Sequence, residues 1–352
     1  MKILYFTKYS RNAGSSRLRS YQYVPWLEDA GFKVEMSPLF SEQYLVNLYA
    51  GTSTLKEAVK GYTKRLLKLF SAAKYDRIVI EKELFPYLPA FAERWLSLLG
   101  VKYIADYDDA IFHNYDRHPN PMIRRVLGKK IDRVMRYADT VVAGNSYLAA
   151  RAEQAGAKSI DIIPTVIDLL RYPKLIPADD QPVILGWIGT KTTFEKHVMP
   201  VMGWLQKAVE ENDMVFHLVG VQPEQDYGDR IRFFPWNEET EVAMIRSFSI
   251  GIMPLQDSLW EQGKCSYKLI QYMACSKPVI ASPVGMNKEV VQEDINGYTA
   301  TGESEWREAV KLLVSDAKKR ADFGNAGRKM VEEKYALQVT ANKWIALLRK
   351  PI

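Results

Sequence analysis

Short apolar runs recur along the chain, and each is followed by a loop and then by a segment with helical spacing. Runs of this kind are typical of parallel strands that are buried on both faces. They lie at 1–7, 32–36, 77–80, 101–105, 140–143 and 160–163 in the first half, and at 183–188, 214–220, 231–235, 250–255 and 278–281 in the second. This alternation of strands and helices predicts an α/β fold with a parallel sheet in each half.

A stretch with linker composition separates the two halves. Residues 172–182 contain three prolines and the pair Asp179-Asp180. With 352 residues, the chain exceeds the usual size of one hydrophobic core, so two α/β domains are expected. The predicted first domain covers residues 1–172 and the second covers 173–336.

The overall composition is that of an ordinary globular protein, with 47% hydrophobic and 26% charged residues. No apolar run approaches the length of a membrane span, and the N-terminus enters a strand rather than a signal peptide. The two cysteines, Cys265 and Cys275, form neither a disulfide framework nor a metal-binding spacing. We therefore expect a cytoplasmic protein.

The net charge of +6 is concentrated in two segments of the first half. Residues 56–77 and 124–136 each carry a balance of +5, so the rest of the chain is acidic by four charges. In the first segment, Lys56, Lys60, Lys64 and Lys68 form one row on a predicted helix, beside an apolar stripe at 55, 59, 62, 66 and 70. Such a helix either packs its stripe on the sheet or lies on an acidic membrane face. We favour contact with an anionic membrane on its inner face, through both segments.

Residues 263–285 hold the most informative motif. A predicted helix at 266–275 follows the strand at 250–255, and Gly263, Ser266 and Lys268 stand at or near its start. Free backbone N–H groups and the helix dipole favour an anion there, and Lys264 adds a second positive charge. The segment therefore predicts a diphosphate site, although two solvated lysines before an ordinary helix fit the spacing as well.

The same segment resembles the donor-site motif of retaining glycosyltransferases of family four, which have the two-domain GT-B fold. Residues 271–274, Gln-Tyr-Met-Ala, match the second half of that motif, and 277–281, Lys-Pro-Val-Ile-Ala, match the strand after it. Gly263 stands where the family has its first glutamate, and Gln271 replaces the second, which holds the ribose. The chain is most similar to a subgroup with Gly-Lys-Cys at this point. The resemblance implies two Rossmann-like domains that face an interdomain cleft, and a last helix, at about 337–352, that crosses back to the first domain.

The resemblance also implies a nucleotide-diphosphate sugar as the donor, with no cofactor and no metal. Lys264 and Lys268 would stabilise the departing diphosphate, and Gln271 would hold the ribose. The expected donor-binding residues are Gly189, Thr190, Lys191, Gly220, Trp236, Gly263, Cys265, Ser266, Tyr267 and Gln271. Cys265 has no adjacent histidine, so we do not expect it to act as a nucleophile.

Polar residues after the first-half strands are the candidates for the acceptor side, because open parallel sheets bind ligands at the carboxyl ends of their strands. Asp109 and His113 are expected to orient an acceptor hydroxyl, although His113 fits a surface role equally well. The expected acceptor-binding residues are Gly14, Ser15, Arg17, Arg19, Asp106 and Asp108. The spacing of Asp106 and Asp108 also suggests the metal motif of the single-domain GT-A fold, which the two α/β halves argue against.

These observations predict a retaining, metal-independent glycosyltransferase. Its expected acceptor is a glycan or lipid-linked glycan of cell-surface polysaccharide synthesis. A nucleotide-sugar epimerase on the same fold and a nucleotide-sugar-binding protein without turnover are the alternatives. A nucleic-acid partner is not expected, because the basic segments carry few interleaved aromatic residues.

Overall fold

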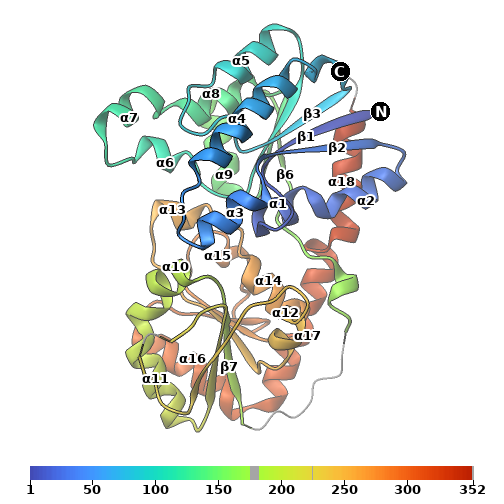
Figure 1. Ribbon diagram of the computed structural model, residues 1–352. Coiled ribbons are helices and arrows are strands. Elements are labelled where there is room, and N and C mark those ends of the chain that lie inside the picture. Colours follow the sequence, from blue (N-terminus) through green and yellow to red (C-terminus); the bar gives the residue numbers. More distant parts are fainter. Residues whose placement is uncertain (175–181, 224, 351–352) are drawn as a thin grey trace. The chain divides into compact units, whose positions relative to one another are not determined.

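The computed structural model describes residues 1–174, 182–223 and 225–350 (Figure 1). Of the predicted linker at 172–182, residues 175–181 lie outside these ranges. Contacts divide the chain into a first unit (Met1–Thr165, Gly263–Cys265 and the chain from Thr340) and a second unit (Val166–Gln262 and Ser266–Val339). The predicted domain boundary at 172 and 173 stays a prediction.

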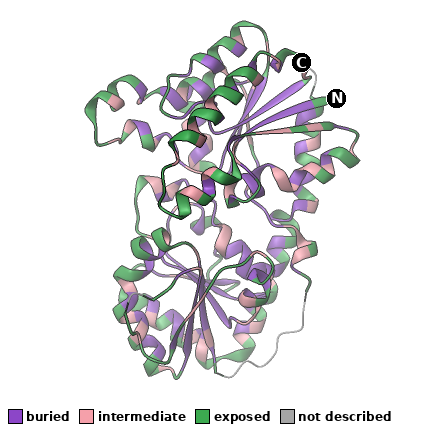
Figure 2. Cartoon of the chain, in the orientation of Figure 1, coloured by how far each residue is buried: buried purple, intermediate pink, exposed green. Residues whose placement is uncertain are grey.

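The first unit is built on a six-stranded parallel sheet with the order β2-β1-β3-β4-β5-β6. Ile3 to Phe6 in β1 and Val141 to Ala143 in β5 are at most 1% exposed, as expected for strands covered on both faces. Figure 2 shows this burial along the sheet. The strands are β1 (Lys2–Tyr9), β2 (Lys33–Phe40), β3 (Arg77–Glu81), β4 (Tyr103–Tyr107), β5 (Thr140–Ala143) and β6 (Ile160–Ile162).

Helices of the first unit connect these strands. They are α1 (Gly14–Arg19), α2 (Val24–Asp29), α3 (Glu42–Tyr49), α4 (Leu55–Leu69), α5 (Phe91–Leu98), α6 (His113–Asp116), α7 (Pro121–Leu127), α8 (Lys130–Tyr137) and α9 (Ser146–Ala155), with 3₁₀ turns η1 (Tyr21–Tyr23) and η2 (Ala72–Lys74). Helix α9 shows how the sequence sets the ends: the Asn145 side chain caps its start, and Gly156, with φ of 77°, ends it.

The second unit repeats the design, with the order β12-β11-β10-β7-β8-β9 and all neighbours parallel. Its strands are β7 (Ile184–Ile188), β8 (Val215–Val219), β9 (Ile231–Phe234), β10 (Ile250–Met253), β11 (Val279–Ala281) and β12 (Gly297–Thr299). The fold class is therefore confirmed as α/β with two parallel sheets. Strand β12 was not predicted, because its three residues are too few to give a periodic signal.

Helices of the second unit are α10 (Lys191–Thr193), α11 (Met202–Glu211), α12 (Glu241–Arg246), α13 (Leu259–Gln262), α14 (Tyr267–Ala274), α15 (Asn287–Val290), α16 (Glu303–Ser315) and α17 (Ala317–Lys334), with η3 (Leu169–Arg171), a π-helical turn η4 (Phe194–Val198) and η5 (Met199–Val201). The predicted helix at 266–275 is confirmed as α14. The last helix, α18 (Leu337–Arg349), runs across the border of the two units, and its Trp344 is fully buried against Tyr5 and Tyr23 of the first unit.

Two helical segments of the first unit are each divided into shorter pieces. The segment from Gly14 to before Gly31 is not one helix but α1, η1 and α2, because Pro25 lacks an N–H and its ring clashes with the carbonyl four residues earlier. The segment 121–137 divides into α7 and α8. Lys130, at the start of α8, is 1% exposed, so it does not belong to a basic surface.

The apolar stripe on α4 does not pack on the sheet. Leu55, Val59 and Phe70 are 71%, 59% and 69% exposed. Helix α4 instead buries Gly61, Arg65 and Leu69. The Arg65 guanidinium donates to the backbone carbonyls of Thr7 (2.6 Å), Ser37 (2.9 Å) and Leu84 (3.4 Å). A buried arginine with these partners anchors the helix, so the stripe is left outside.

Candidate functional sites in the two units

The carboxyl ends of β1, β3 and β4 bring together a compact charged cluster in the first unit. The Lys82 ammonium lies 2.9 Å from Asp108 Oδ1 and 3.4 Å from Asp109 Oδ2, and it donates to the Ser15 hydroxyl at 3.0 Å. The Ser15 hydroxyl donates to Asp108 Oδ2 at 2.6 Å. Lys82 has φ of 67°, an uncommon conformation for a residue with a side chain and one that is often found at functional sites. Three predicted residues, Ser15, Asp108 and Asp109, therefore share one lysine that the sequence did not single out.

Burial and charge separate the carboxyl groups of this cluster. Burial, and then the charge of Asp108, raises the pKa of Asp109. Burial alone would raise the pKa of Asp108 too, but Lys82 and Arg19 hold it below its usual range. Burial also raises the pKa of Glu81, at the end of β3, to about 7. Carboxyl groups with separated pKa values are what proton transfer or oriented hydrogen bonding to a hydroxyl requires.

Glu81 contacts the same cluster through hydrogen bonds from neighbouring residues. Its carboxylate accepts from the Ser16 hydroxyl at 2.9 Å and from the Lys8 backbone N–H at 3.3 Å. The side chain is 1% exposed. The only signal for it in the sequence is its place at the end of an apolar strand.

Arg19 and Asp106 form a buried pair, in which the guanidinium donates through Nε at 3.1 Å and through a second nitrogen. Arg19 also donates to the Ile163 carbonyl at 2.8 Å, and both side chains of the pair are 1% exposed. This geometry favours a role in the fold over contact with a ligand. Arg17 is buried as well, at 8% exposure. A Cβ atom on Gly14 would meet nothing within 4 Å, so no steric need explains that glycine.

His113 uses both ring nitrogens inside the first unit. Its Nδ1 lies 2.8 Å from Asp116 Oδ1, and its Nε2 lies 2.9 Å from the Tyr147 hydroxyl. The two contacts fix the ring on α6. Its expected role toward an acceptor hydroxyl stays a prediction.

The segment Gly263–Cys265 groups with the first unit. A Cβ atom on Gly263 would lie 2.5 Å from Ala110 Cβ and 2.7 Å from Ala110 N, so no larger residue fits there without a shift. The Lys264 carbonyl accepts from Asn145 Nδ2 at 3.0 Å, and the charge of Lys264 acts on Asp109. Steric exclusion therefore accounts for a glycine at this position.

The Cys265 side chain is buried and does not face solvent. Its Sγ donates to the Asp108 carbonyl at 3.1 Å, and a Cβ atom on Gly144 would lie 2.4 Å from that sulfur. Burial raises the pKa of the Cys265 thiol to about 12. A thiol of this kind is not a nucleophile at neutral pH.

In the second unit, α14 starts after Ser266, whose φ is 51°. The Ser266 hydroxyl donates to Asn287 Oδ1 at 2.7 Å, inside the fold, and Asn287 Nδ2 in turn donates to the Ser282 carbonyl at 2.9 Å. Tyr267 is half-buried. Lys268 is also half-buried, and its ammonium lies over the Trp187 ring, 5.6 Å from the ring centroid. Trp187 belongs to β7, so Lys268 lies near the end of that strand.

Two glycines allow a close approach at the ends of β7 and β8. A Cβ atom on Gly189 would lie 2.6 Å from the Trp187 ring. Gly220 has φ of 91°, and a Cβ atom there would lie 2.2 Å from the Gly189 carbonyl oxygen and 3.4 Å from Trp236 Cβ. Because Trp236 is 43% exposed beside them, its indole can stack on a planar ligand. The second unit thus brings Gly189, Gly220 and Trp236 together.

Gln271 is linked to Trp236 by a buried hydrogen-bond network. Gln271 Nε2 donates to the Tyr172 hydroxyl at 3.0 Å, which donates to Glu241 Oε1 at 3.2 Å, and Trp236 Nε1 donates to Glu241 Oε2 at 2.7 Å. Gln271 itself is 3% exposed. No pattern in the sequence singles out Tyr172 or Glu241, because their pairing depends on segments distant in the chain.

Thr190 and Lys191 lie on the surface. Thr190 and Thr193 form a capping box around the short helix α10. The Lys191 side chain is 69% exposed and lies 3.7 Å from Glu195. Glu261, which was not predicted, is 1% exposed and lies 3.4 Å from His197 and 2.6 Å from Lys196.

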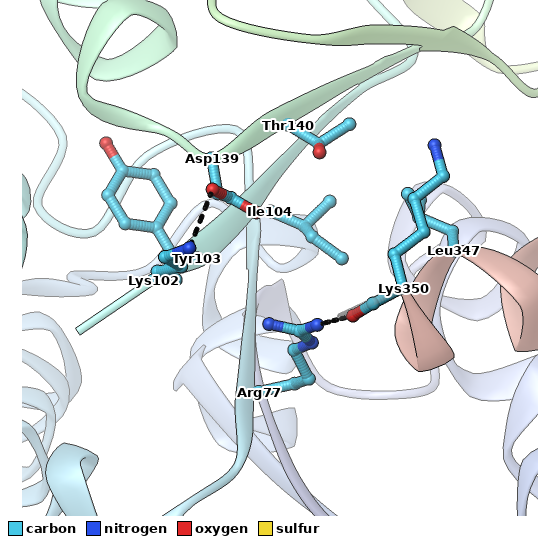
Figure 3. Close-up of a pocket in the computed structure, with 8 residues that line it drawn as sticks. All are labelled: Arg77, Lys102, Tyr103, Ile104, Asp139, Thr140, Leu347 and Lys350. Atoms are coloured by element: carbon cyan, nitrogen blue, oxygen red, sulfur yellow. Dashed lines mark hydrogen bonds and ion pairs between the residues drawn. The ribbon is translucent and has the colours of Figure 1, made fainter. Parts of the chain in front are cut away.

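A small pocket lies at the opposite, amino ends of β3, β4 and β5 (Figure 3). Its volume is about 20 Å³, room for one water. Arg77 donates from this pocket to the Leu348 carbonyl at 3.2 Å and to the Lys350 carbonyl, which satisfies the last carbonyls of α18. The pocket serves the fold rather than a substrate.

Two six-stranded parallel sheets, with polar and glycine residues gathered at the carboxyl ends of their strands, match the GT-B class of glycosyltransferase folds. Residues 183–316 match the family model described as "Glycosyl transferases group 1". Over these residues the chain is therefore similar to the group 1 glycosyltransferases.

Known proteins of this kind are similar to the chain at low identity. The putative teichuronic acid biosynthesis glycosyltransferase TuaH of Bacillus subtilis is 22% identical over 273 residues, which cover 65% of this chain and 68% of TuaH. A glycosyltransferase of Rickettsia africae has a TM-score of 0.72 at 12% identity, covering 99% of this chain and 98% of its own. Anabaena HepE, solved with UDP and glucose, has a TM-score of 0.68 at 16% identity, with both chains fully covered. At these identities, the likeness to the solved structures supports the fold alone.

Proposed function

We propose that the chain transfers a sugar from a nucleotide-diphosphate sugar to a glycan or lipid-linked acceptor in cell-surface polysaccharide synthesis. The observation that carries this proposal is the family match over 183–316, which includes the β7, β8 and β10–α14 strand ends with Gly189, Gly220 and Lys268. The crystal complex of HepE with UDP and glucose supports a UDP-sugar donor. The name of TuaH supports an acceptor of the cell surface.

The mechanism follows from charge. The leaving diphosphate gains negative charge as the glycosidic bond breaks, so fixed cations and N–H groups stabilise that state more than the ground state. Lys268 and the first turn of α14 supply such groups in the second unit, and Lys264 adds a charge. Trp236 is the surface on which the base stacks, and the Gln271 network holds that surface in place. A departing phosphate oxygen serves as base for the acceptor, which gives retention without a metal.

The test uses UDP-glucose as the probe and measures UDP release with and without acceptor glycans. We expect UDP to raise the melting temperature, since a ligand that binds only the native state stabilises it. Lys268→Gln is expected to lower turnover about 100-fold. Lys191→Gln should lower it only a few-fold, because that side chain is 69% exposed. Lys311→Gln, an exposed lysine of α16, is the control.

Three outcomes would contradict parts of this proposal. Isomerised sugar from UDP-glucose alone would indicate an epimerase. UDP binding without product on any acceptor would indicate a binding protein without turnover. Equal turnover by Lys268→Gln and Lys311→Gln would show that Lys268 of α14 does not stabilise the leaving diphosphate.

We also propose that the first unit docks on an anionic membrane. Among the described residues, no helix is long and apolar enough to cross a bilayer. The exposed residues Leu55, Val59, Leu66 and Leu67 of α4, with Phe70 directly after it, nevertheless form an apolar face. This face continues to Trp95 of α5, whose ring centroid lies 6.0 Å from that of Phe70. Exposed apolar patches rimmed by lysine are typical of interfacial helices.

The charges of this face are fewer than the sequence suggested. Lys68 pairs with Glu35, and Lys60 lies 3.8 Å from Glu57. The side chains of Lys56, Lys60 and Lys64 are exposed on α4. At about 1 kcal/mol for each lysine near an acidic bilayer, the triple change of these residues to Gln should weaken binding roughly 100-fold. Cosedimentation with vesicles of phosphatidylcholine, with and without phosphatidylglycerol, measures the effect. Equal binding to both vesicles would contradict the electrostatic part of the proposal. Unchanged binding of a Leu66→Glu/Leu67→Glu variant would contradict the proposed role of the apolar face.

A further inference from the structure

An aromatic groove of about 600 Å³ opens in the first unit, within the size range of small-molecule sites. Its walls come from the carboxyl ends of β1 and β2, from α3 and α4, and from the loop after β3. It is lined by Lys8, Tyr9, Phe40, Tyr44, Ala58, Val59, Tyr62, Thr63, Pro86 and Tyr87. None of these residues belongs to the charged cluster of Lys82 or was predicted to bind donor or acceptor, and Val59 is shared with the apolar face of α4.

The aromatic rings of the groove form a continuous surface. Tyr9 and Phe40 are register partners at the ends of β1 and β2, with ring centroids 5.6 Å apart. Phe40 stacks on Tyr44 at 4.1 Å, and Tyr62 follows at 6.4 Å from Phe40. Four of the lining aromatics are tyrosines, so flat apolar faces carry hydroxyl groups at their edges. A sugar ring has the complementary pattern, an apolar face with hydroxyl groups around it.

Lys8 gives the groove a positive charge. Its ammonium lies 5.3 Å from the centroid of the Tyr9 ring. Among residues 1–174, 182–223 and 225–350, no carboxylate forms an ion pair with it. Burial and the neighbouring charge of Lys82 lower the pKa of Lys8. Glu83, Glu81 and Asp109 act on the Lys8 ammonium without an ion pair to it, so an anion from a ligand would be its direct partner.

The loop after β3 is held firmly in place beside the groove. Tyr87, like Lys82, has a positive φ, of 58°, and its N–H donates to the Tyr115 hydroxyl at 3.1 Å. The Tyr62 hydroxyl donates to the Pro86 carbonyl at 2.6 Å. The buried Lys130 ammonium donates to the Phe85 carbonyl at 2.5 Å. A strained loop that so many buried polar groups support is typical of a binding site rather than of a simple connection.

The groove also borders the candidate acceptor site. The backbone N–H of Lys8 donates to Glu81, and the charges of Lys82 and Asp109 act on the Lys8 ammonium. A ligand in the groove thus lies next to the carboxyl groups that are proposed to orient an acceptor hydroxyl.

We propose that this groove binds an acceptor sugar ring that carries a negative charge, with the ring on the tyrosine faces and the anion at Lys8. The inference rests on the proposed glycosyltransferase function, and it names the substrate class of the first unit. The anion is the carboxylate of a uronic acid or the phosphate of a phosphorylated sugar, and both have the chemistry that an ammonium group recognises.

Ligand-detected NMR titration with three probes tests the proposal: glucuronic acid, glucose 6-phosphate and glucose. We expect both charged sugars to bind and to compete with each other, and the tighter one identifies the source of the anion. Lys8→Met should weaken both charged probes about 10-fold or more and leave glucose unchanged. Ala58→Trp, which fills the groove from α4, should abolish binding of all three. Lys33→Met, an exposed lysine at the start of β2, is the control.

Both variants are expected to fold, since Lys8→Met removes a partly desolvated charge and Ala58 is half-buried on a helix surface. Denaturant unfolding checks this before titration. Equal affinities for glucose and the charged probes, or wild-type affinities in Lys8→Met or Ala58→Trp, would overturn the proposal. The UDP thermal shift of the wild-type protein separates this failure from failure of the proposed function, because it reports donor binding alone.

Discussion

The buried ion pair between Lys130 and Glu83 offers the sharpest test of how the first unit is stabilised. The two side chains are 1% and 4% exposed. The Tyr115 hydroxyl lies 2.8 Å from both Glu83 oxygens, and the Lys130 ammonium lies 5.1 Å from the centroid of the Tyr115 ring. Lys130→Met keeps the volume of the side chain and removes its charge, so the Glu83 carboxylate stays buried with only a neutral partner.

The magnitude follows from the cost of an uncompensated buried charge. Breaking a buried pair on one side costs about 3–5 kcal/mol, whereas replacing both partners with neutral groups is often close to neutral. For a unit of this size, such a loss lowers the melting temperature by about 6–20 °C. The double variant Lys130→Met/Glu83→Gln should recover most of that loss.

Urea unfolding, followed by circular dichroism, gives the free energies of unfolding for the wild type, the two single variants and the double variant. A loss below about 1 kcal/mol for Lys130→Met would refute the reasoning, since it would mean that water reaches Glu83. A double variant as unstable as Lys130→Met would refute it too. It would show that the packing of Lys130 and not its charge is what matters.

Two further predictions concern the second unit. Burial lowers the pKa of His217 in β8 to about 4, so the folded state resists protonation and stability falls as the pH drops below the unfolded value of about 6.5. The contribution of His217 to the free energy of unfolding should therefore fall by about 2 kcal/mol between pH 7 and pH 5. Because the raised pKa of Glu81 acts in the opposite direction, the measured quantity is the stability difference between the wild type and His217→Phe, which should change by that amount in urea titrations at the two pH values. Gly220→Ala should cost about 3 kcal/mol, because φ is 91° and the new methyl group would lie 2.2 Å from the Gly189 oxygen. Gly203→Ala in α11, where a Cβ atom meets nothing within 4 Å, should instead gain about 0.5–1 kcal/mol, and equal effects of the two changes would contradict the steric argument.

The sheets could be predicted from the sequence because parallel strands that are buried on both faces leave continuous apolar runs. The predicted run at 140–143 corresponds to β5 without a shift of either end, and ten other runs fall on strands within a few residues. The three residues of β12 carry too little pattern to be recognised. The confirmed helix α14 was predicted from its apolar face and from the family resemblance together.

The orientation of α4 could not be predicted, because a periodic stripe says that one face is apolar but not which face is buried. That choice depends on Arg65, whose carbonyl partners at Thr7, Ser37 and Leu84 lie far away in the chain. The charged cluster was missed in part for the same reason. In the sequence, Glu81 and Lys82 are marked only by their place after an apolar strand, and the positions of Ser16 and Asp108 make them a buried site.

The buried Arg65 has a consequence for which residues of α4 can be replaced. Because Arg65 holds α4 in place, the exposed apolar residues of the helix contribute little to folding. Replacing them should change the free energy of unfolding very little. Those outer residues can therefore be replaced to suit the surface that α4 contacts, while Arg65 and its carbonyl partners keep the helix in place. Surface contact and fold stability thus depend on different residues of the same helix.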